Sequence, residues 1–161
     1  MVDEVAGCTE PRAAALAVTE AAPVAPGKKV VLVGAGRLGL LIAQVLQRTG
    51  CDLTVVVRRP ERTALLADWG IASVTPDAAP QGMDMVVECS GQPEGLALAQ
   101  GLLRPRGRLV LKSTYPEAAA LDWTALVVNE QQLIGSRCGS FAPALALLQR
   151  GGVKTAPLLD R

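Results

Sequence analysis

The chain has 161 residues, of which 50% are hydrophobic, and its 16 basic and 15 acidic side chains leave a formal net charge of +1. A chain of this length forms one domain with a substantial core, and the balanced charge argues against a nucleic-acid or anionic-membrane surface. Aromatic residues make up only 2% of the chain, so a platform for base stacking is not expected.

Helical and strand-like stretches alternate along the chain. The alanine-rich stretch 10–22 predicts a first helix that Thr9 can cap, and the prolines and glycine of PVAPGKK at 23–29 mark a linker. The strands expected after it are 29–33, 53–57, 71–74, 83–88, 108–112 and 132–136. The helices expected between and after them are 37–49, 61–69, 94–103, 121–128 and 141–149, with RPRG at 104–107 as a break before the fifth strand.

Most of the expected strands are apolar along nearly their whole length, as in KVVLV and LTVVV. A strand that is buried on both faces needs helices above and below it, and this arrangement is typical of parallel sheets. The sequence therefore predicts an α/β fold with a doubly wound, parallel, six-stranded sheet over residues 25–161, preceded by a helix and linker at 1–24.

The stretch VVLVGAGRLGLLIAQVLQRTG at 30–50 is interpreted as a G-x-G-x-x-G turn and not as a membrane span. A membrane helix tolerates a central arginine poorly, whereas Arg37 follows a glycine break between an expected strand and an expected helix. In this context the first glycine permits a tight turn, the second lets a diphosphate approach the backbone, and the third lets the helix pack closely. The candidate residues of this Rossmann-type unit are Gly34, Ala35, Gly36, Arg37, Leu38 and Gly39. A glycine-rich turn without a ligand is the alternative.

The residues after the second strand favour NADP(H) over NAD(H). An acidic side chain usually stands there when the cofactor is NAD, because it bonds the ribose hydroxyls and repels a 2′-phosphate. This chain instead has Arg58 and Arg59, whose planar guanidinium groups suit a phosphate. Asp52 precedes the strand and is badly placed as a substitute. The alternative is that both arginines belong to a solvated loop.

Cysteine and histidine usage narrows the possible chemistry. The four cysteines, Cys8, Cys51, Cys89 and Cys138, are far apart, which predicts reduced thiols in a cytosolic protein and no zinc knuckle or redox motif. The chain has no histidine, so the commonest general base and the commonest catalytic zinc ligand are missing. The N-terminus, MVDEVAGCTEPR, lacks the pattern of a secretory signal.

In the order and spacing of its blocks, the chain resembles the nucleotide-binding half of the medium-chain dehydrogenases, the zinc alcohol and polyol dehydrogenase superfamily. The resemblance begins at TEP with the alanine-rich helix and continues through APGKKVVLVGAGRLGLLIAQVL. It then covers VVECSGQPEGLALAQGLLRPRGRLVLKSTY and LIGSRCGSFAPALALL, so it runs nearly end to end. The order of these blocks is more specific than any one of them.

The resemblance implies further cofactor contacts after the later strands. The loop beside the adenosine and the nicotinamide ribose would be formed by Cys89, Ser90 and Gly91, and the segment near the nicotinamide by Lys112, Ser113 and Thr114. The sixth strand would complete the nicotinamide pocket, and pair edge to edge with a second copy, through Gly135, Ser136 and Arg137. Small residues also fit strand ends for packing reasons alone.

Two more residues match the family. Arg59, followed by Pro60, matches the phosphate-binding arginine of NADP-dependent members. Glu10 looks like the glutamate near the catalytic zinc of polyol-dehydrogenase-like members, although an acid at a helix start is also favoured by the helix dipole. The cysteine and the Gly-His-Glu segment that hold that zinc in the family's catalytic domain are not present. No catalytic and no metal-binding residue is therefore expected in this chain, and zinc is expected only in a missing catalytic domain.

Three functions are consistent with these observations. The first is the NAD(P)(H)-binding part of a zinc-type alcohol dehydrogenase-like oxidoreductase, completed by a separate catalytic chain or domain and inactive alone. The second is a stand-alone dinucleotide-binding or sensing module without catalysis. The third is a remnant that keeps the fold as an assembly module and has lost the ligand. The expected partners are a dinucleotide and a second copy paired through the last strand, with no nucleic acid and no membrane.

Overall fold

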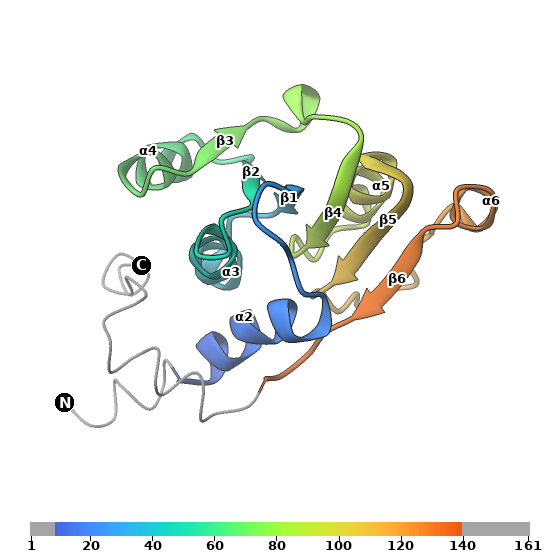
Figure 1. Cartoon of the computed structure of the whole chain (residues 1–161), viewed down its shortest axis with the longest axis horizontal. Helices are drawn as coiled ribbons and strands as arrows, with labels where there is room; N and C mark the ends of the chain where they lie inside the picture. The colour runs from blue at the N-terminus through green and yellow to red at the C-terminus, as the bar shows by residue number, and fades with distance from the viewer. Residues whose placement is uncertain (1–8, 140–161) are drawn as a thin grey trace.

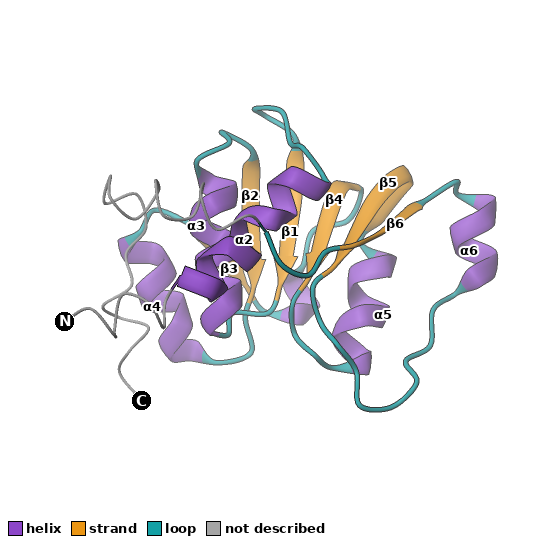
Figure 2. Ribbon diagram, turned by 90° about the horizontal axis from the view of Figure 1, so that it is seen from below, coloured by secondary structure: helices purple, strands orange, loops and turns teal. Residues whose placement is uncertain are grey.

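The structure is a computed structural model that describes residues 9–139, in which a central sheet lies between two layers of helices (Figures 1 and 2). The strands are β1 Lys29–Val33, β2 Asp52–Val56, β3 Ala72–Val74, β4 Met83–Glu88, β5 Leu103–Leu111 and β6 Gln132–Gly135. The helices are α2 Thr9–Ala21, α3 Arg37–Gln47, α4 Pro60–Asp68, α5 Pro93–Gly101 and α6 Trp123–Val128, with a short 3₁₀ turn, η1, at Pro76–Ala78.

The described strands form one sheet in the order β3-β2-β1-β4-β5-β6, and every neighbouring pair is parallel. The strand order runs outward in one direction from β1 and in the other from β4. In sheets of this kind, ligands bind in the crevice that opens at the carboxyl ends of the two strands where the order reverses. The prediction of a doubly wound, parallel, six-stranded sheet is confirmed, and it places the candidate site between β1 and β4.

The core explains why the strands are apolar throughout. In β1, Val30 and Leu32 belong to the apolar cluster that includes α2, α3 and Leu66 of α4, whereas Val31 and Val33 belong to the cluster that includes α5. All four of these β1 side chains are at most 3% exposed. Successive residues of a strand point to opposite faces, so a strand covered on both faces needs apolar side chains at every position.

The expected break at RPRG, 104–107, is wrong, because these residues lie inside β5. Met83 pairs with Leu103 and Met85 with Arg108, so two steps along β4 correspond to five steps along β5. The extra residues form a bulge in which Arg106 has a positive φ of 63° and donates its backbone N–H to the Asn129 carbonyl at 2.7 Å. A bulge absorbs additional residues without ending the pairing, and the strand therefore begins before the proline.

Most other bounds differ from expectation by a few residues. The helix expected at 37–49 ends at Gln47, because the chain turns there and Gly50, with φ of +76°, donates its backbone N–H to the Gln47 carbonyl at 3.2 Å. The 3₁₀ turn η1 was not predicted. The helix expected at 141–149 lies outside the described residues.

The first helix is packed onto the sheet domain. Ala15 and Val18 of α2 are fully buried and join the same apolar cluster as α3. The chain leaving β6 runs closely past this helix (Figure 1), since a Cβ added to Gly139 would lie 2.3 Å from the Ala13 carbonyl oxygen. The division of the chain at residues 24 and 25 stays a prediction.

Within residues 9–139, no helix combines the length and the apolar character needed to cross a bilayer. The described cysteines Cys51, Cys89 and Cys138 are free thiols. The cytosolic location that their spacing suggested stays a prediction.

Candidate functional site

Two adjoining hollows lie at the switch point between β1 and β4. The first has a volume of about 260 Å³ and is lined by Val33, Gly34, Ala35, Gly36, Val56, Arg58, Arg59, Arg62, Pro76, Cys89, Ser90, Gln92, Gly95 and Leu98. The second has a volume of about 270 Å³ and is lined by Gly36, Arg37, Leu38, Gly39, Cys89, Ser90, Gly91, Lys112, Ser113 and Thr114. They share Gly36, Cys89 and Ser90, so they adjoin at the ends of the strands, and the two hollows together are called the cleft.

The glycine turn between β1 and α3 is packed so tightly that two of its glycines cannot carry a side chain. Gly34 has φ of +109°, and a Cβ there would lie 2.8 Å from the backbone carbonyl of Cys89. A Cβ on Gly39 would lie 2.2 Å from the Gly34 carbonyl oxygen. The third glycine, Gly39, thus lets α3 pack directly against the turn that precedes it.

Gly36 is different, because the protein itself does not require a glycine there. A Cβ on this residue would meet nothing within 4 Å, and its φ of −71° and ψ of −176° are open to any residue. Gly36 lines both hollows. The Gly36 backbone therefore borders both hollows, and a side chain there would stand in space that no protein atom within 4 Å fills.

The N-terminus of α3 points its first backbone amides at the same place. Gly36 is the N-cap residue, no side chain caps the helix, and its first turn contains no acidic residue. Uncapped backbone N–H groups and the positive end of the helix dipole attract anions. The cleft therefore offers an anion site where its two halves meet.

Three arginines line the first hollow at the end of β2. Arg58 and Arg59 were predicted to face a phosphate, and Arg62 adds a third guanidinium from the first turn of α4. No acidic residue is among the residues that line this hollow, and none of the three arginines forms an ion pair with another residue in the described range. Positive charge without neutralising carboxylates suits a ligand group that carries negative charge.

Arg62 could have been found from the sequence. Residues three apart on a helix lie on the same face, and Pro60 marks the first turn of α4, whose N-cap is Arg59. The Arg62 backbone N–H donates to the Arg59 carbonyl at 3.0 Å. The i, i+3 spacing of Arg59 and Arg62 was the signal.

The second hollow is built from the loops after β4 and β5. The Gly91 backbone N–H donates to the Ser113 hydroxyl at 2.8 Å, which joins the two loops. Burial, and then the nearby Glu88, raises the pKa of Cys89 to about 12. Its thiol is therefore neutral at physiological pH and is not an activated nucleophile.

Lys112 lines the second hollow, but its ammonium group is already engaged with the end of β6. It donates to the Ser136 carbonyl at 3.1 Å, to the Ser136 hydroxyl at 3.3 Å and to the Arg137 carbonyl. Gly135 and Ser136 line neither hollow. In this arrangement Ser136 and Arg137 hold the Lys112 ammonium group. A direct contact between Gly135, Ser136 or Arg137 and a ligand stays a prediction.

The described residues do not contain a donor set that fits a zinc ion. Within residues 9–139, no three side chains of Cys, Asp, Glu or His lie together in a group that could hold a metal. Catalytic zinc sites use three such protein ligands and leave one position open. No step through a metal can be derived from this part of the chain.

Comparison with known proteins finds dehydrogenases as relatives of this chain. A family described as zinc-binding dehydrogenase matches residues 38–150. The chain is 29% identical over 175 residues to D-arabinitol dehydrogenase 1 of Uromyces fabae, in an alignment that covers 96% of this chain and 50% of that protein.

Solved structures share the fold at low sequence identity. A zinc-binding dehydrogenase of Sinorhizobium meliloti 1021, solved bound to NADP, matches with a TM-score of 0.84 and 24% identity over 91% of this chain and 48% of its own. An alcohol dehydrogenase of E. coli CFT073, solved with NADH, matches with a TM-score of 0.82 and 23% identity over 91% of this chain and 48% of its own.

The chain spans about half the length of the relatives that it matches. The matched residues 38–150 include α3 from its second residue onward, the loops after β4 and β5, and the strand β6. The resemblance seen in the sequence blocks is confirmed: the chain belongs to the zinc-binding dehydrogenase family.

Proposed function

We propose that the cleft between β1 and β4 binds a nicotinamide adenine dinucleotide, with NADP(H) preferred over NAD(H). The observation that carries this proposal is the position of Gly36, which lines both hollows and where a Cβ would meet no protein atom within 4 Å. Relatives of the same fold were solved with NADP and with NADH, which supports a nicotinamide dinucleotide without deciding between the two.

The residues present fit the parts of such a ligand. The diphosphate would lie against Gly36 and the first amides of α3. The adenosine ribose belongs at the end of β2, where Arg58, Arg59 and Arg62 would face a 2′-phosphate. The nicotinamide half would then occupy the second hollow, beside Gly91 and Ser113. When bound, the cofactor supplies a hydride donor or acceptor, and the chain itself supplies binding and orientation.

The activity of the whole protein is a further part of the proposal. A dinucleotide held in this cleft would exchange a hydride with an alcohol or a carbonyl compound, as the names of the relatives suggest. The described residues offer no metal donor set, so the substrate oxygen would have to be polarised by a catalytic domain or chain beyond them. The second candidate, a module that binds or senses the dinucleotide without catalysis, is favoured by that same lack of donors.

Titration of the purified chain with NADPH and with NADH, followed by calorimetry, tests the proposal. Saturable binding of both, with NADPH the tighter ligand, is the expected result. Absence of heat and of any thermal shift with either ligand would contradict it and would favour a remnant that keeps the fold only. Measuring turnover of alcohols with NADP on the same sample separates the two binding functions, because a sensing module binds without turnover.

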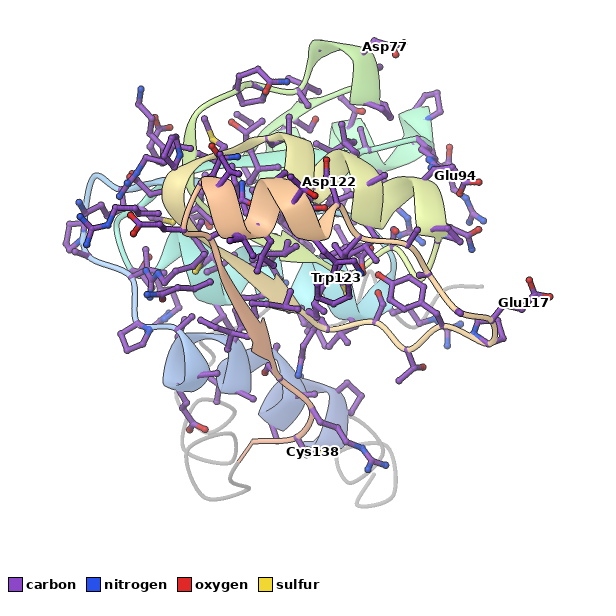
Figure 3. The ribbon with its side chains drawn as sticks, turned by 90° about the vertical axis from the view of Figure 1, so that its right-hand side faces the viewer. Asp77, Glu94, Glu117, Asp122, Trp123 and Cys138 are labelled. Atoms are coloured by element: carbon purple, nitrogen blue, oxygen red, sulfur yellow. The ribbon has the colours of Figure 1, made fainter. Side chains whose placement is uncertain are left out.

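We also propose that two copies pair through the edge strand β6. The strand is exposed along most of its length, with Leu133 38% exposed, and the adjoining helix α6 presents Trp123, Val127 and Val128 at 64%, 71% and 74% exposure. Figure 3 looks directly onto this helix, with Trp123 labelled on it. An apolar edge of this kind is a template for pairing with another strand.

The variant Leu133→Lys is expected to turn the dimer into a monomer, because a charge on the edge strand opposes pairing. Light scattering after size-exclusion chromatography measures the mass directly. Ala67→Lys, on the exposed face of α4 beyond the opposite edge of the sheet, is the matched control and should leave the dimer intact. A monomeric wild-type chain, or a dimer unaffected by Leu133→Lys, would rule this interface out.

A further inference from the structure

Glu88, the last residue of β4, is a carboxylate with no exposed surface. Acidic side chains are almost never fully buried unless they are well paired. One of its oxygens, Oε1, accepts the Ser90 backbone N–H at 2.7 Å and the Ser90 hydroxyl at 2.5 Å, and the other, Oε2, accepts the Tyr115 hydroxyl. Glu88 lines neither hollow of the cleft, so its role there would be indirect.

The partners of Glu88 come from two different loops. Ser90 belongs to the loop after β4, and Tyr115 follows the segment 112–114, which leaves β5 and lines the second hollow. Burial, and then the contact with Glu88, raises the pKa of Tyr115, so its hydroxyl keeps its proton and remains a donor. The carboxylate is thus a bridge between the loops that form the two sides of this hollow.

A second link runs parallel to the first. The Gly91 backbone N–H donates to the Ser113 hydroxyl at 2.8 Å, so the two loops are joined at the surface of the hollow as well as beneath it. Helix α5 holds the bridge in place, because a Cβ on Gly95 would lie 2.0 Å from the Ser90 hydroxyl oxygen and 3.3 Å from Glu88 Oε1. The Ser90–Glu88 pair therefore has little room to rearrange.

We propose that Glu88 is a positioning residue for the nicotinamide half of the ligand: through its hydrogen bonds to Ser90 and Tyr115 it fixes the distance between the loops that line the second hollow. This inference rests on the proposed dinucleotide function. The arginines of the first hollow lie after β2 and make none of these contacts. Ser90 lines both hollows, whereas Tyr115 follows the segment 112–114, which lines only the second. Loss of the Tyr115 hydroxyl should therefore affect chiefly the nicotinamide half of the ligand.

The variant Tyr115→Phe tests the bridge, because it keeps the packing of the ring and removes only the hydroxyl. We expect it to weaken NADPH about tenfold, the effect of losing one hydrogen bond to a charged group, and to leave the affinity for 2′,5′-ADP within about twofold, since that probe lacks the nicotinamide. The fluorescence of bound NADPH should also shift toward that of the free cofactor, which a general loss of stability would not cause.

Further variants separate positioning from folding. Ser113→Ala removes the hydrogen bond between Ser113 and the Gly91 backbone. Like Tyr115→Phe, it should weaken NADPH and leave the affinity for 2′,5′-ADP nearly unchanged. Glu88→Gln should keep NADPH binding near the level of the unaltered chain, because the glutamine amide can accept from Ser90 and donate to Tyr115. Gln100→Leu removes a buried side chain that bonds the Asp122 backbone at 2.8 and 2.9 Å, away from the cleft. It should lower the melting temperature and leave NADPH binding unchanged.

Three results would overturn the inference. Equal weakening of NADPH and 2′,5′-ADP by Tyr115→Phe would show a general effect, and no weakening of either would show that the bridge is not needed. Loss of binding in Glu88→Gln would show that the charge, and not the contacts, is what matters. If the unaltered chain binds neither NADPH nor 2′,5′-ADP, the proposed function itself fails. If it binds both and Tyr115→Phe does not weaken NADPH selectively, only the proposed role of Glu88 fails.

Discussion

Replacing Gly36 with valine is expected to weaken binding of NADPH and NADH alike by at least about a hundredfold, the equivalent of losing one or two hydrogen bonds to a charged group. Gly36 lines both hollows, so we expect the added side chain to occupy the space where they adjoin. There it would hold a diphosphate away from the uncapped amides of α3. Calorimetric titration of the variant measures this loss directly.

The same variant is expected to fold normally. A Cβ on Gly36 would meet no atom within 4 Å, and the backbone there has an extended conformation that valine adopts readily. The melting temperature should therefore fall by no more than about 4 °C, since valine is a poorer N-cap residue than glycine and the loss of a good cap costs about 1 kcal/mol. Circular dichroism and a thermal melt check this before any ligand is added.

Two other glycines serve as matched controls. Gly39→Ala would place a Cβ 2.2 Å from the Gly34 carbonyl oxygen, so it should lower the melting temperature even without ligand. Gly101→Ala, at the end of α5, would meet nothing within 4 Å, so it should not lower the melting temperature and should leave binding unchanged. If Gly36→Val bound both cofactors as tightly as the unaltered chain, the diphosphate could not lie at this turn, and the proposed site would be wrong.

The contrast between these glycines shows what the sequence could and could not predict. The G-x-G-x-x-G spacing follows from a local turn, and the apolar strands follow from burial on both faces, so the fold and the end of the sheet that carries the site were both predictable. The spacing alone did not reveal that Gly34 and Gly39 have no room for a side chain, whereas Gly36 has room for one. That distinction depends on where the Cys89 backbone lies, and this is a contact between distant parts of the chain.

Other features stayed hidden for related reasons. RPRG has the composition of a turn, and only the pairing of β5 with β4 shows that a bulge keeps it within a strand. Glu88 ends the strand MDMVVE, directly after three apolar residues. Its position in the sequence gives no sign that the Tyr115 hydroxyl, 27 residues further along the chain, donates a hydrogen bond to it. Local patterns predict elements and turns, whereas buried polar pairs depend on tertiary contacts that no single stretch contains.

The second large effect is expected at the arginines of the first hollow. Arg59→Ala should weaken NADPH about 30-fold, since a hydrogen-bonded guanidinium–phosphate contact is worth about 2 kcal/mol, and should change the affinity for NADH less than about twofold. Only NADPH carries the 2′-phosphate that the guanidinium would meet. Arg59 is exposed, so its loss should leave the melting temperature nearly unchanged.

Arg62→Ala should act in the same direction, because this side chain lines the same hollow one helical turn further along α4. Lys28→Ala is the matched control: it removes the same charge from an exposed position just before the opposite, amino-terminal end of β1. It should leave the affinities for both cofactors unaffected, which separates a local contact from a change in net charge.

The preference for NADPH should also shrink as salt is added, since exposed charges are screened. Equal losses of NADPH and NADH affinity in Arg59→Ala would show that the arginine does not read the 2′-phosphate, and the cofactor preference would then have no basis in this hollow.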